Sequence, residues 1–241
     1  NFDDCQNLIK SIFNDLPFKA EYQLGAVNSV NWARILAQVV YYFYAWYELD
    51  MPKSLDVAVP TGNFGDIFAG YLARSMGLPI NKLILATNSN DILSRFFNTG
   101  IYQRAEVHFT DSPAMDIQVS SNFERYLYYK LDESGEKVSD FFEKFLKEGT
   151  ARLNFNTKSF DESFIAGSAN DAETRDTIRR VYEENDYLVD PHTAVGIHVG
   201  SQHRTEGIPL LCLSTAHPAK FEDVIRRSIP EMVPHHPTLD A

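Results

Sequence analysis

The first segment whose residue types could do chemistry is a glycine-containing turn, Thr61-Gly62-Asn63-Phe64-Gly65-Asp66. It lies between a β-branched run that ends at Pro60 and a run of apolar residues with helical spacing. Backbone N–H groups and the helix dipole at such a junction make an anion site, and glycine lets the backbone approach a phosphate closely. The turn has neither the P-loop ending nor the G-x-G-x-x-G dinucleotide pattern. An ordinary tight turn explains the same residues, so both interpretations stay open at this point.

The second candidate is Ser214-Thr215-Ala216-His217-Pro218, which follows an apolar run and opens a helix with Pro218 in its first turn. Ser214 or Thr215 would place a hydroxyl at the carboxyl end of a strand, where it can hydrogen-bond a ring nitrogen without imposing charge. Thr215 could equally serve only as a helix cap. Lys220 lies one turn into the same helix, and we expect it to be a surface lysine.

Two further segments place polar side chains near helix starts. Asn31 and Arg34 are three residues apart and share a helix face, where the arginine could bind a phosphate or carboxylate or could form a surface ion pair. Asp190 and Pro191 fit the N-cap and the first position of a helix. His192 could act as an acid or base, although the helix start explains this pattern without any function.

Charge and composition argue against several other classes of function. The 33 acidic residues outnumber the 22 lysines and arginines, and the net charge of −11 argues against a general nucleic-acid binder and against docking on anionic lipid. The histidines lack metal-ligand spacing, so we expect no metal. The sequence also has no G-x-S-x-G motif, which would indicate a serine nucleophile. Two cysteines, Cys5 and Cys212, make no disulfide framework, and we expect a reduced, cytoplasmic protein.

The elements that must position these residues follow an α/β pattern. We expect strands over 54–60 and 82–86, each followed by a short turn and a helix, and these helices over 66–76 and 91–97. Two consecutive βα units predict a parallel sheet flanked by helices. An aromatic-rich apolar stretch over 35–47, shorter than the ~20 residues of a membrane span, predicts a core helix that Asn28-Ser29 would cap.

A change of composition divides the chain into three parts. Residues 1–121 carry the first part of the α/β pattern. Charged helical segments dominate residues 122–185, where we expect a helical insert. The α/β pattern returns over 186–241, with a strand at 208–213 and a helix that begins at Pro218.

Seven blocks of residues occur in an order that is typical of one enzyme family. They are Asn28-Ser29-Val30-Asn31-Trp32-Ala33-Arg34-Ile35-Leu36-Ala37-Gln38, Val59-Pro60-Thr61-Gly62-Asn63-Phe64-Gly65-Asp66, Gly77-Leu78-Pro79-Ile80, Ala86-Thr87-Asn88-Ser89-Asn90-Asp91, Ala114-Met115-Asp116, Asp190-Pro191-His192-Thr193-Ala194 and Ser214-Thr215-Ala216-His217-Pro218-Ala219-Lys220-Phe221. Together they resemble threonine synthase, a pyridoxal-phosphate enzyme family with the tryptophan-synthase-β-like fold of type II. A single Gly-Asn-Phe-Gly would be weak, but seven ordered blocks that cover nearly the whole chain are specific.

The resemblance implies pyridoxal 5′-phosphate as cofactor and a lyase reaction that converts O-phospho-L-homoserine and water to L-threonine and phosphate, the last step of threonine biosynthesis. It implies that the cofactor phosphate is held by the turn residues Gly62, Asn63, Phe64, Gly65 and Asp66. It assigns the hydroxyl that faces the pyridine nitrogen to Thr215, with Ser214 as second choice. It gives a role in binding the substrate phosphate to Asn31 and Arg34.

The family also needs a lysine that forms a Schiff base with the cofactor, and no lysine of this chain belongs to that motif. In the family this lysine lies upstream of the equivalent of Asn1. We therefore expect the chain to be the C-terminal portion of a longer enzyme, to need the missing N-terminal portion as its partner, and to be inactive alone. The opening Asn1-Phe2-Asp3, without an initiator Met or a signal-peptide pattern, agrees with that expectation.

Two other functions stay open from the sequence. One is a threonine-synthase-like phospho-lyase that acts on another phosphorylated hydroxy-amino acid. The other is a non-catalytic protein that keeps a phosphate-binding surface for interaction. We expect a small phosphorylated amino acid as the ligand, and neither nucleic acid nor a membrane as a partner. The oligomeric state is not predicted.

Overall fold

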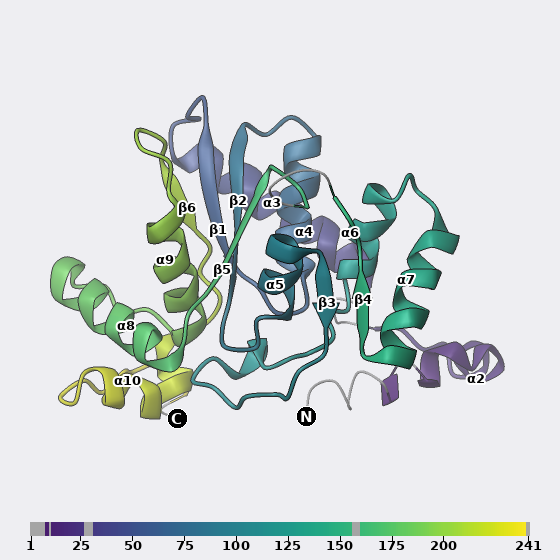
Figure 1. Cartoon of the computed structure of the whole chain (residues 1–241). Helices are drawn as coiled ribbons and strands as arrows, with labels where there is room; N and C mark the ends of the chain where they lie inside the picture. Colours follow the sequence, from purple (N-terminus) through teal and green to yellow (C-terminus); the bar gives the residue numbers. More distant parts are fainter. Residues whose placement is uncertain (1–7, 10, 27–30, 156–159, 240–241) are drawn as a thin grey trace.

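The centre of the fold is a parallel sheet of four strands in the order β5-β2-β1-β6, seen in Figure 1. The computed structural model describes residues 8–9, 11–26, 31–155 and 160–239. The strands are β1 (Leu55–Pro60), β2 (Ile80–Thr87), β5 (Phe164–Ser168) and β6 (Leu210–Cys212). The two strands predicted from the first βα units, β1 and β2, lie in the middle, which confirms the parallel sheet. A separate antiparallel pair consists of β3 (Ile101–Gln103) and β4 (Thr150–Arg152).

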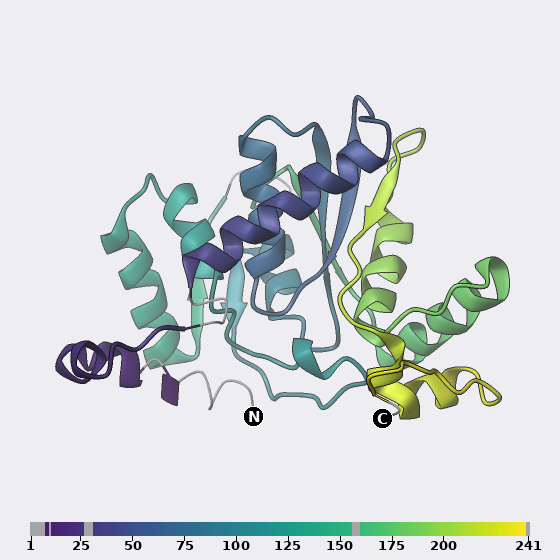
Figure 2. The same ribbon diagram turned by 180° about the vertical axis from the view of Figure 1, so that it is seen from behind.

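Helices cover both faces of the central sheet. They are α2 (Leu16–Glu21), α3 (Trp32–Glu48), α4 (Gly65–Ser75), α5 (Ile92–Thr99), α6 (Phe123–Lys130), α7 (Gly135–Glu148), α8 (Asp171–Asn185), α9 (Pro191–His203) and α10 (Glu222–Ser228), with short 3₁₀ turns η1 (Pro113–Met115) and η2 (Pro218–Phe221). From behind, Figure 2 shows α3 running across α4, with α8, α9 and α10 grouped at the other side of the molecule. No helix within the described residues combines the length and the apolar character that crossing a bilayer requires.

Alternating side chains of β1 and β2 serve two different cores. Val57 and Leu83 belong to the large core that α3, α4 and α5 cover. Ala58 and Ile84 point to the opposite face, where they pack against Val195 of α9. Because both faces are covered, the strands are apolar along nearly their whole length, as is typical of parallel sheets.

Helix α9 approaches the sheet closely because of a glycine. A Cβ atom added to Gly196 would lie 2.9 Å from Cγ of Pro60, the last residue of β1. A side chain there would push the helix away from the strand. The close approach brings the N-terminus of α9, with Asp190 as its N-cap, toward the carboxyl end of β1.

Several predicted boundaries differ from those observed. Helix α3 begins at Trp32 and its N-cap is Asn31, whose side chain accepts a hydrogen bond from the Ala33 N–H; the predicted cap Asn28-Ser29 lies outside the described residues. The helix predicted from Pro218 is divided into η2 and α10.

The span predicted as a helical insert, 122–185, holds α6, α7 and α8 but also β5, which pairs with β2 along the central sheet. We did not foresee β5 because it is a five-residue edge strand that ends in Gly167 and Ser168, which gives little strand signal. The three-part division of the chain itself stays a prediction.

Candidate functional site

A cavity of about 330 Å³ lies where the turn after β1 meets the segment after β6. Its walls include Gly62, Asn63, Ala114, His192, Thr215 and Lys220. Because parallel strands end at the same edge of a sheet, two segments far apart in the sequence meet here, as is typical of ligand sites in open α/β sheets. We call residues 62–65 the turn wall, of which Gly62 and Asn63 line the cavity. We call Asp190, His192, Thr193 and Thr215 the carboxylate wall, of which His192 and Thr215 line it.

The turn wall is fixed by a buried ring. Phe64 has a left-handed backbone with φ of 67°, and its side chain is 1% exposed. The ring lies 5.4 Å from that of Phe123 and 5.3 Å from that of Tyr126, measured between centroids. Helix α4 starts directly after it, and the Asn63 side chain accepts a hydrogen bond from the Gly65 N–H at 3.0 Å. The packing of Phe64 therefore sets both the turn and the origin of α4.

The backbone carbonyls of the turn are bound on one side by the loop that joins β3 to α6 (residues 104–122). The Ser120 hydroxyl donates to the Gly62 carbonyl at 3.1 Å, and the Asn122 N–H donates to the Asn63 carbonyl at 3.0 Å. In a trans peptide the N–H points opposite to the carbonyl, so the N–H groups of Asn63 and Phe64 face away from these two donors. A Cβ atom at Gly62 would lie 3.0 Å from the Ala114 carbonyl oxygen, so the turn tolerates little more than glycine at this position.

Asp66 differs from the other predicted cofactor-binding residues. Burial raises its pKa to about 6, and among the described residues its Oδ1 has no hydrogen-bond partner. The Tyr42 hydroxyl of α3 donates to the Asp66 backbone carbonyl at 2.8 Å. Like Phe64 and Gly65, Asp66 is not among the described residues that line the cavity, but unlike them it carries a carboxylate, which would not favour a bound phosphate.

The carboxylate wall is built around Asp190. This N-cap accepts hydrogen bonds at 2.9 Å from both the backbone N–H and the ring Nδ1 of His192, and another from the Thr193 hydroxyl. Asp190 is 1% exposed. Burial by itself would raise its pKa, but the hydrogen bonds from His192 and Thr193 outweigh burial and hold the pKa below its usual value. Asp190 is therefore a buried carboxylate that stays ionised.

Thr215 joins this network across 25 residues of sequence. Its N–H donates to Thr193 Oγ1 at 3.1 Å, and its hydroxyl lies 3.3 Å from each oxygen of Asp190. Helix capping is done by another residue, since the His217 side chain accepts from the Ala219 N–H at the start of η2. Ser214 lines a neighbouring cavity instead. The geometry thus favours Thr215 over Ser214 as the hydroxyl at this site.

Both nitrogens of the His192 ring are engaged. Nε2 accepts a hydrogen bond from the Ala114 N–H at 3.2 Å, so we assign the ring proton to Nδ1, which donates to Asp190. The neutral ring thereby links α9 to the loop over the turn wall. This arrangement supports a positioning role for His192 and leaves neither nitrogen open for acid or base catalysis.

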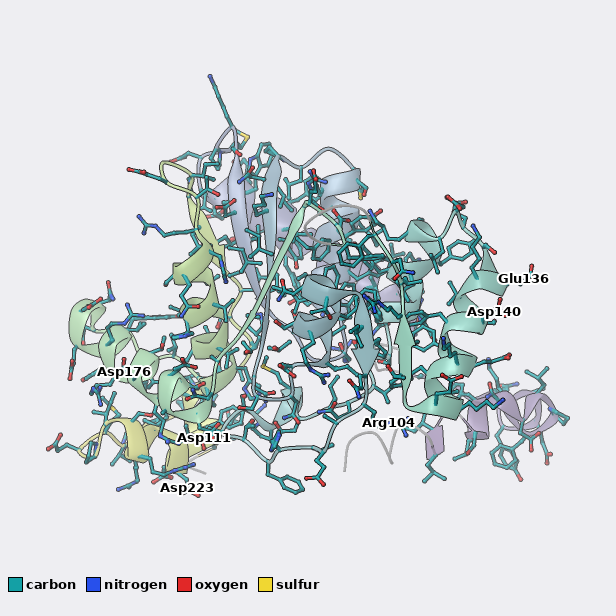
Figure 3. All side chains as sticks on the ribbon, viewed as in Figure 1. Arg104, Asp111, Glu136, Asp140, Asp176 and Asp223 are labelled. Atoms are coloured by element: carbon teal, nitrogen blue, oxygen red, sulfur yellow. The ribbon has the colours of Figure 1, made fainter. Side chains whose placement is uncertain are left out.

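The loop over the turn wall is held by two buried aspartates that sequence reasoning gave no role. Asp116 Oδ1 accepts from Asn88 at 2.8 Å and from the Thr110 hydroxyl at 2.7 Å. Asp111, labelled in Figure 3 where the loop meets α8 and α10, accepts from Arg175 and from Arg227, the latter at 2.7 Å. The presence of Asn88 and Asp116 in two of the family-like blocks could have signalled Asp116, whereas Asp111 lies in none of the blocks.

The remaining candidates, Lys220, Asn31 and Arg34, differ in whether they line the cavity. Lys220, expected as a surface lysine, is exposed but also lines the cavity, and its ammonium forms no ion pair within the described part of the chain. Asn31 is occupied as the cap of α3, where its amide also donates to the Ala26 carbonyl at 2.9 Å. Asn31 and Arg34 are both exposed, and neither is among the described residues that line this cavity.

Comparison with known proteins places this geometry in a family. A family model described as threonine synthase, C-terminal, matches residues 193–240. The chain is 42% identical to threonine synthase of Schizosaccharomyces pombe and 46% identical to that of Methylobacillus glycogenes, over 95% and 93% of its length. It covers 50% and 49% of those two proteins, so it spans about half the length of the curated relatives that it matches.

Solved structures agree with the sequence comparison. Threonine synthase from Brucella melitensis, described with bound pyridoxal phosphate, superposes with a TM-score of 0.87 at 45% identity and covers 98% of this chain and 51% of that one. Threonine synthase from yeast gives a TM-score of 0.87 at 39% identity, over 100% of this chain and 52% of that one. These similarities confirm the predicted α/β fold of a type-II pyridoxal-phosphate enzyme, and the chain belongs to the threonine synthase family.

Proposed function

We propose that this chain is the C-terminal portion of a pyridoxal-phosphate-dependent threonine synthase. The whole enzyme would convert O-phospho-L-homoserine and water to L-threonine and phosphate. The observation that carries the proposal is the meeting of Gly62 and Asn63 with Thr215 in one cavity, in a chain 42–46% identical to threonine synthases. We propose a cytoplasmic location for the enzyme, because the sequence predicts a reduced, cytoplasmic protein and the proposed role is biosynthetic.

The residues of the cavity fit the cofactor. A volume of about 330 Å³ lies within the range of roughly 300–1,000 Å³ that is usual for small-molecule sites. At the turn wall, the start of α4 offers backbone N–H groups and the positive end of a helix dipole to a phosphate, and Gly62 leaves room for the loop at Ala114. At the carboxylate wall, the Thr215 hydroxyl can form a hydrogen bond with the pyridine nitrogen. When bound, pyridoxal phosphate supplies an electron sink for carbanion chemistry.

The residues of this chain would bind and orient rather than break bonds. The backbone of Gly62, Asn63, Phe64 and Gly65 would hold the cofactor phosphate, and Thr215 would set the tilt of the ring. The loop at Ala114, fixed by His192, closes one side of the cavity and limits water there. Asp66 is the weakest of the predicted phosphate contacts, because it is buried near Tyr42 and carries a carboxyl group.

The substrate phosphate needs its own cation, because the chain as a whole repels anions with a net charge of −11. Of the two predicted residues we favour Arg34 for the charge of its guanidinium group, since the Asn31 oxygen caps α3 and the Asn31 amide nitrogen donates to the Ala26 carbonyl. The cofactor-linked lysine would come from the missing N-terminal portion. Lys82 is unsuited to that part, because its amine donates to the Glu162 carbonyl at 2.6 Å, away from the cavity.

The test is made on the full-length protein loaded with pyridoxal phosphate. We expect the visible absorbance of the bound cofactor and release of phosphate from O-phospho-L-homoserine, with none from the present chain alone. A Lys220→Ala variant should keep the visible absorbance, which separates Lys220 from the cofactor-linked lysine.

Three outcomes would contradict the proposal in different ways. Release of phosphate from O-phosphothreonine but not from O-phospho-L-homoserine would favour the related phospho-lyase. Neither cofactor absorbance nor release in a correctly folded full-length protein would favour the non-catalytic interaction protein. Full activity of the present chain alone would show that the lysine lies within these residues.

A further inference from the structure

Asp190 carries more hydrogen bonds than a helix cap requires. Its carboxylate accepts from the backbone and ring of His192, from the hydroxyls of Thr193 and Thr215, and from the Ala216 N–H at 3.3 Å. A cap needs only one oxygen, and neutral Asn or Ser serves as well. Within the described residues no lysine or arginine lies within ion-pair distance of Asp190, and the ring that lies beside it, His192, is neutral. Burying an ionised carboxylate without a permanent cation is costly, so the charge has a role beyond capping.

The carboxylate fixes the Thr215 oxygen from two directions. Directly, Asp190 offers both of its oxygens to the Thr215 hydroxyl at 3.3 Å. Indirectly, it accepts from the Thr193 hydroxyl, and Thr193 Oγ1 in turn accepts from the Thr215 N–H at 3.1 Å. Because an ionised carboxylate only accepts, the donor hydrogens of this group converge on Asp190.

The same carboxylate also reaches the loop over the turn wall. By holding the proton on His192 Nδ1, it leaves Nε2 to accept from the Ala114 N–H. The carbonyl of Ala114 is the group that comes within 3.0 Å of a Cβ atom placed on Gly62. A chain of hydrogen bonds therefore runs from Asp190 through His192 to Ala114, in the loop that lies beside Gly62.

We propose that Asp190 is the positioning residue of this cavity, placing the Thr215 hydroxyl for the ring nitrogen of the cofactor and holding the loop over the phosphate end through His192. Asp190 acts through these neighbours and needs no contact with the cofactor. The inference rests on the proposed function, because the ligand is pyridoxal phosphate.

The test is a double-mutant cycle on the full-length apoenzyme, with pyridoxal phosphate titrated as the probe. We expect Thr215→Val and Asp190→Asn each to weaken the dissociation constant about tenfold, the scale of one hydrogen bond to a charged or ring partner. The double variant should also bind pyridoxal phosphate about tenfold more weakly, because both substitutions break the same hydrogen-bonded arrangement. Thr215→Ser, which keeps the hydroxyl, should bind within about threefold of the unchanged protein.

A loss of about a hundredfold in the double variant, the product of the two single losses, would overturn the proposal. If the unchanged protein binds no pyridoxal phosphate, the proposed function fails instead, so the two failures are distinguishable. Should Asp190→Asn not fold, Thr193→Val replaces it in the cycle, with the same non-multiplicative result expected. Nitrogen-15 NMR of His192 adds a readout: a ring protonated at Nδ1 supports the proposal, and one protonated at Nε2 contradicts it.

Discussion

The two walls of the cavity are built on different physical principles. The turn wall is fixed by packing, since the Phe64 ring anchors it in an aromatic core and its position does not depend on ionisation. The carboxylate wall is fixed by hydrogen bonds that converge on the single charge of Asp190. Removing buried volume should therefore destabilise the turn wall, and removing the charge of Asp190 should destabilise the carboxylate wall.

The largest expected effect is on the turn wall. Phe64→Ala should lower the free energy of unfolding by about 3–5 kcal/mol, because it empties a fully buried aromatic site. Urea denaturation measures the loss, which should be the same at pH 5 and pH 7. Phe64→Leu is the control, since it keeps most of the volume and should cost clearly less. A loss below about 1 kcal/mol for Phe64→Ala would show that the ring does not anchor the turn.

Asp190→Ala should have the next largest effect, about 2–3 kcal/mol at pH 7, because it leaves buried donors without an acceptor. Its pH dependence separates the two walls. The pKa of Asp190 is lowered in the folded state, so its stabilisation is present above the unfolded pKa and is lost as pH falls through the folded pKa. The gap in urea midpoint between this variant and the unchanged protein should therefore narrow below about pH 4. A gap independent of pH would mean that the charge is not what matters.

Asp66→Asn should change stability in the opposite direction. Burial raises the pKa of Asp66 to about 6, so the folded state binds a proton that the unfolded state has released between about pH 4 and 6. Stability from this group consequently falls as pH rises through that window, and the charged form is a penalty at pH 7. The amide removes the penalty, and we expect a gain of about 1–2 kcal/mol at pH 7.5 that disappears below pH 4. Urea midpoints at the two pH values measure it, and a loss at pH 7.5 would contradict the assignment.

The smallest expected effect is that of Ser214→Ala. This exposed hydroxyl lies next to Thr215 in sequence but lines a different cavity, so its removal should change stability by less than about 0.5 kcal/mol. Affinity of the full-length apoenzyme for pyridoxal phosphate should stay unchanged, in contrast to Thr215→Val. If the serine variant were the weaker binder of the two, the roles of Ser214 and Thr215 would have to be exchanged.

Local features of the site could be predicted from the sequence because short-range chemistry decides them. Asp190 as a cap and Pro191 after it obey rules that involve only neighbouring residues, and the structure confirms both. The same rules predicted Asn28-Ser29 as the cap of α3, where the structure has Asn31, since Asn and Ser both cap helices well. The order of strands and turns likewise predicted the parallel sheet.

Contacts over long separations could not be predicted in this way. Nothing in the spacing of residues indicates that the His192 ring accepts from Ala114, or that Thr215 reaches Asp190. These pairings depend on where α9 crosses the sheet, which the fit of Gly196 against Pro60 decides. Lys220 is exposed, as expected of a surface lysine, but helical position alone does not reveal that a cavity opens beside it.

The strand order also has a consequence for how the protein is made. β6 pairs with β1 in the register Asp56↔Leu210, so 210 − 56 = 154 residues must be synthesised between the two partners. At about 5–20 residues per second, this takes roughly 8–30 s on the ribosome. During that time one edge of β1 has unpaired backbone groups, which can pair with other chains. The cavity is therefore completed late in translation, because a chain stopped before Leu210 would hold residues 62–65 and Asp190 but would lack Thr215.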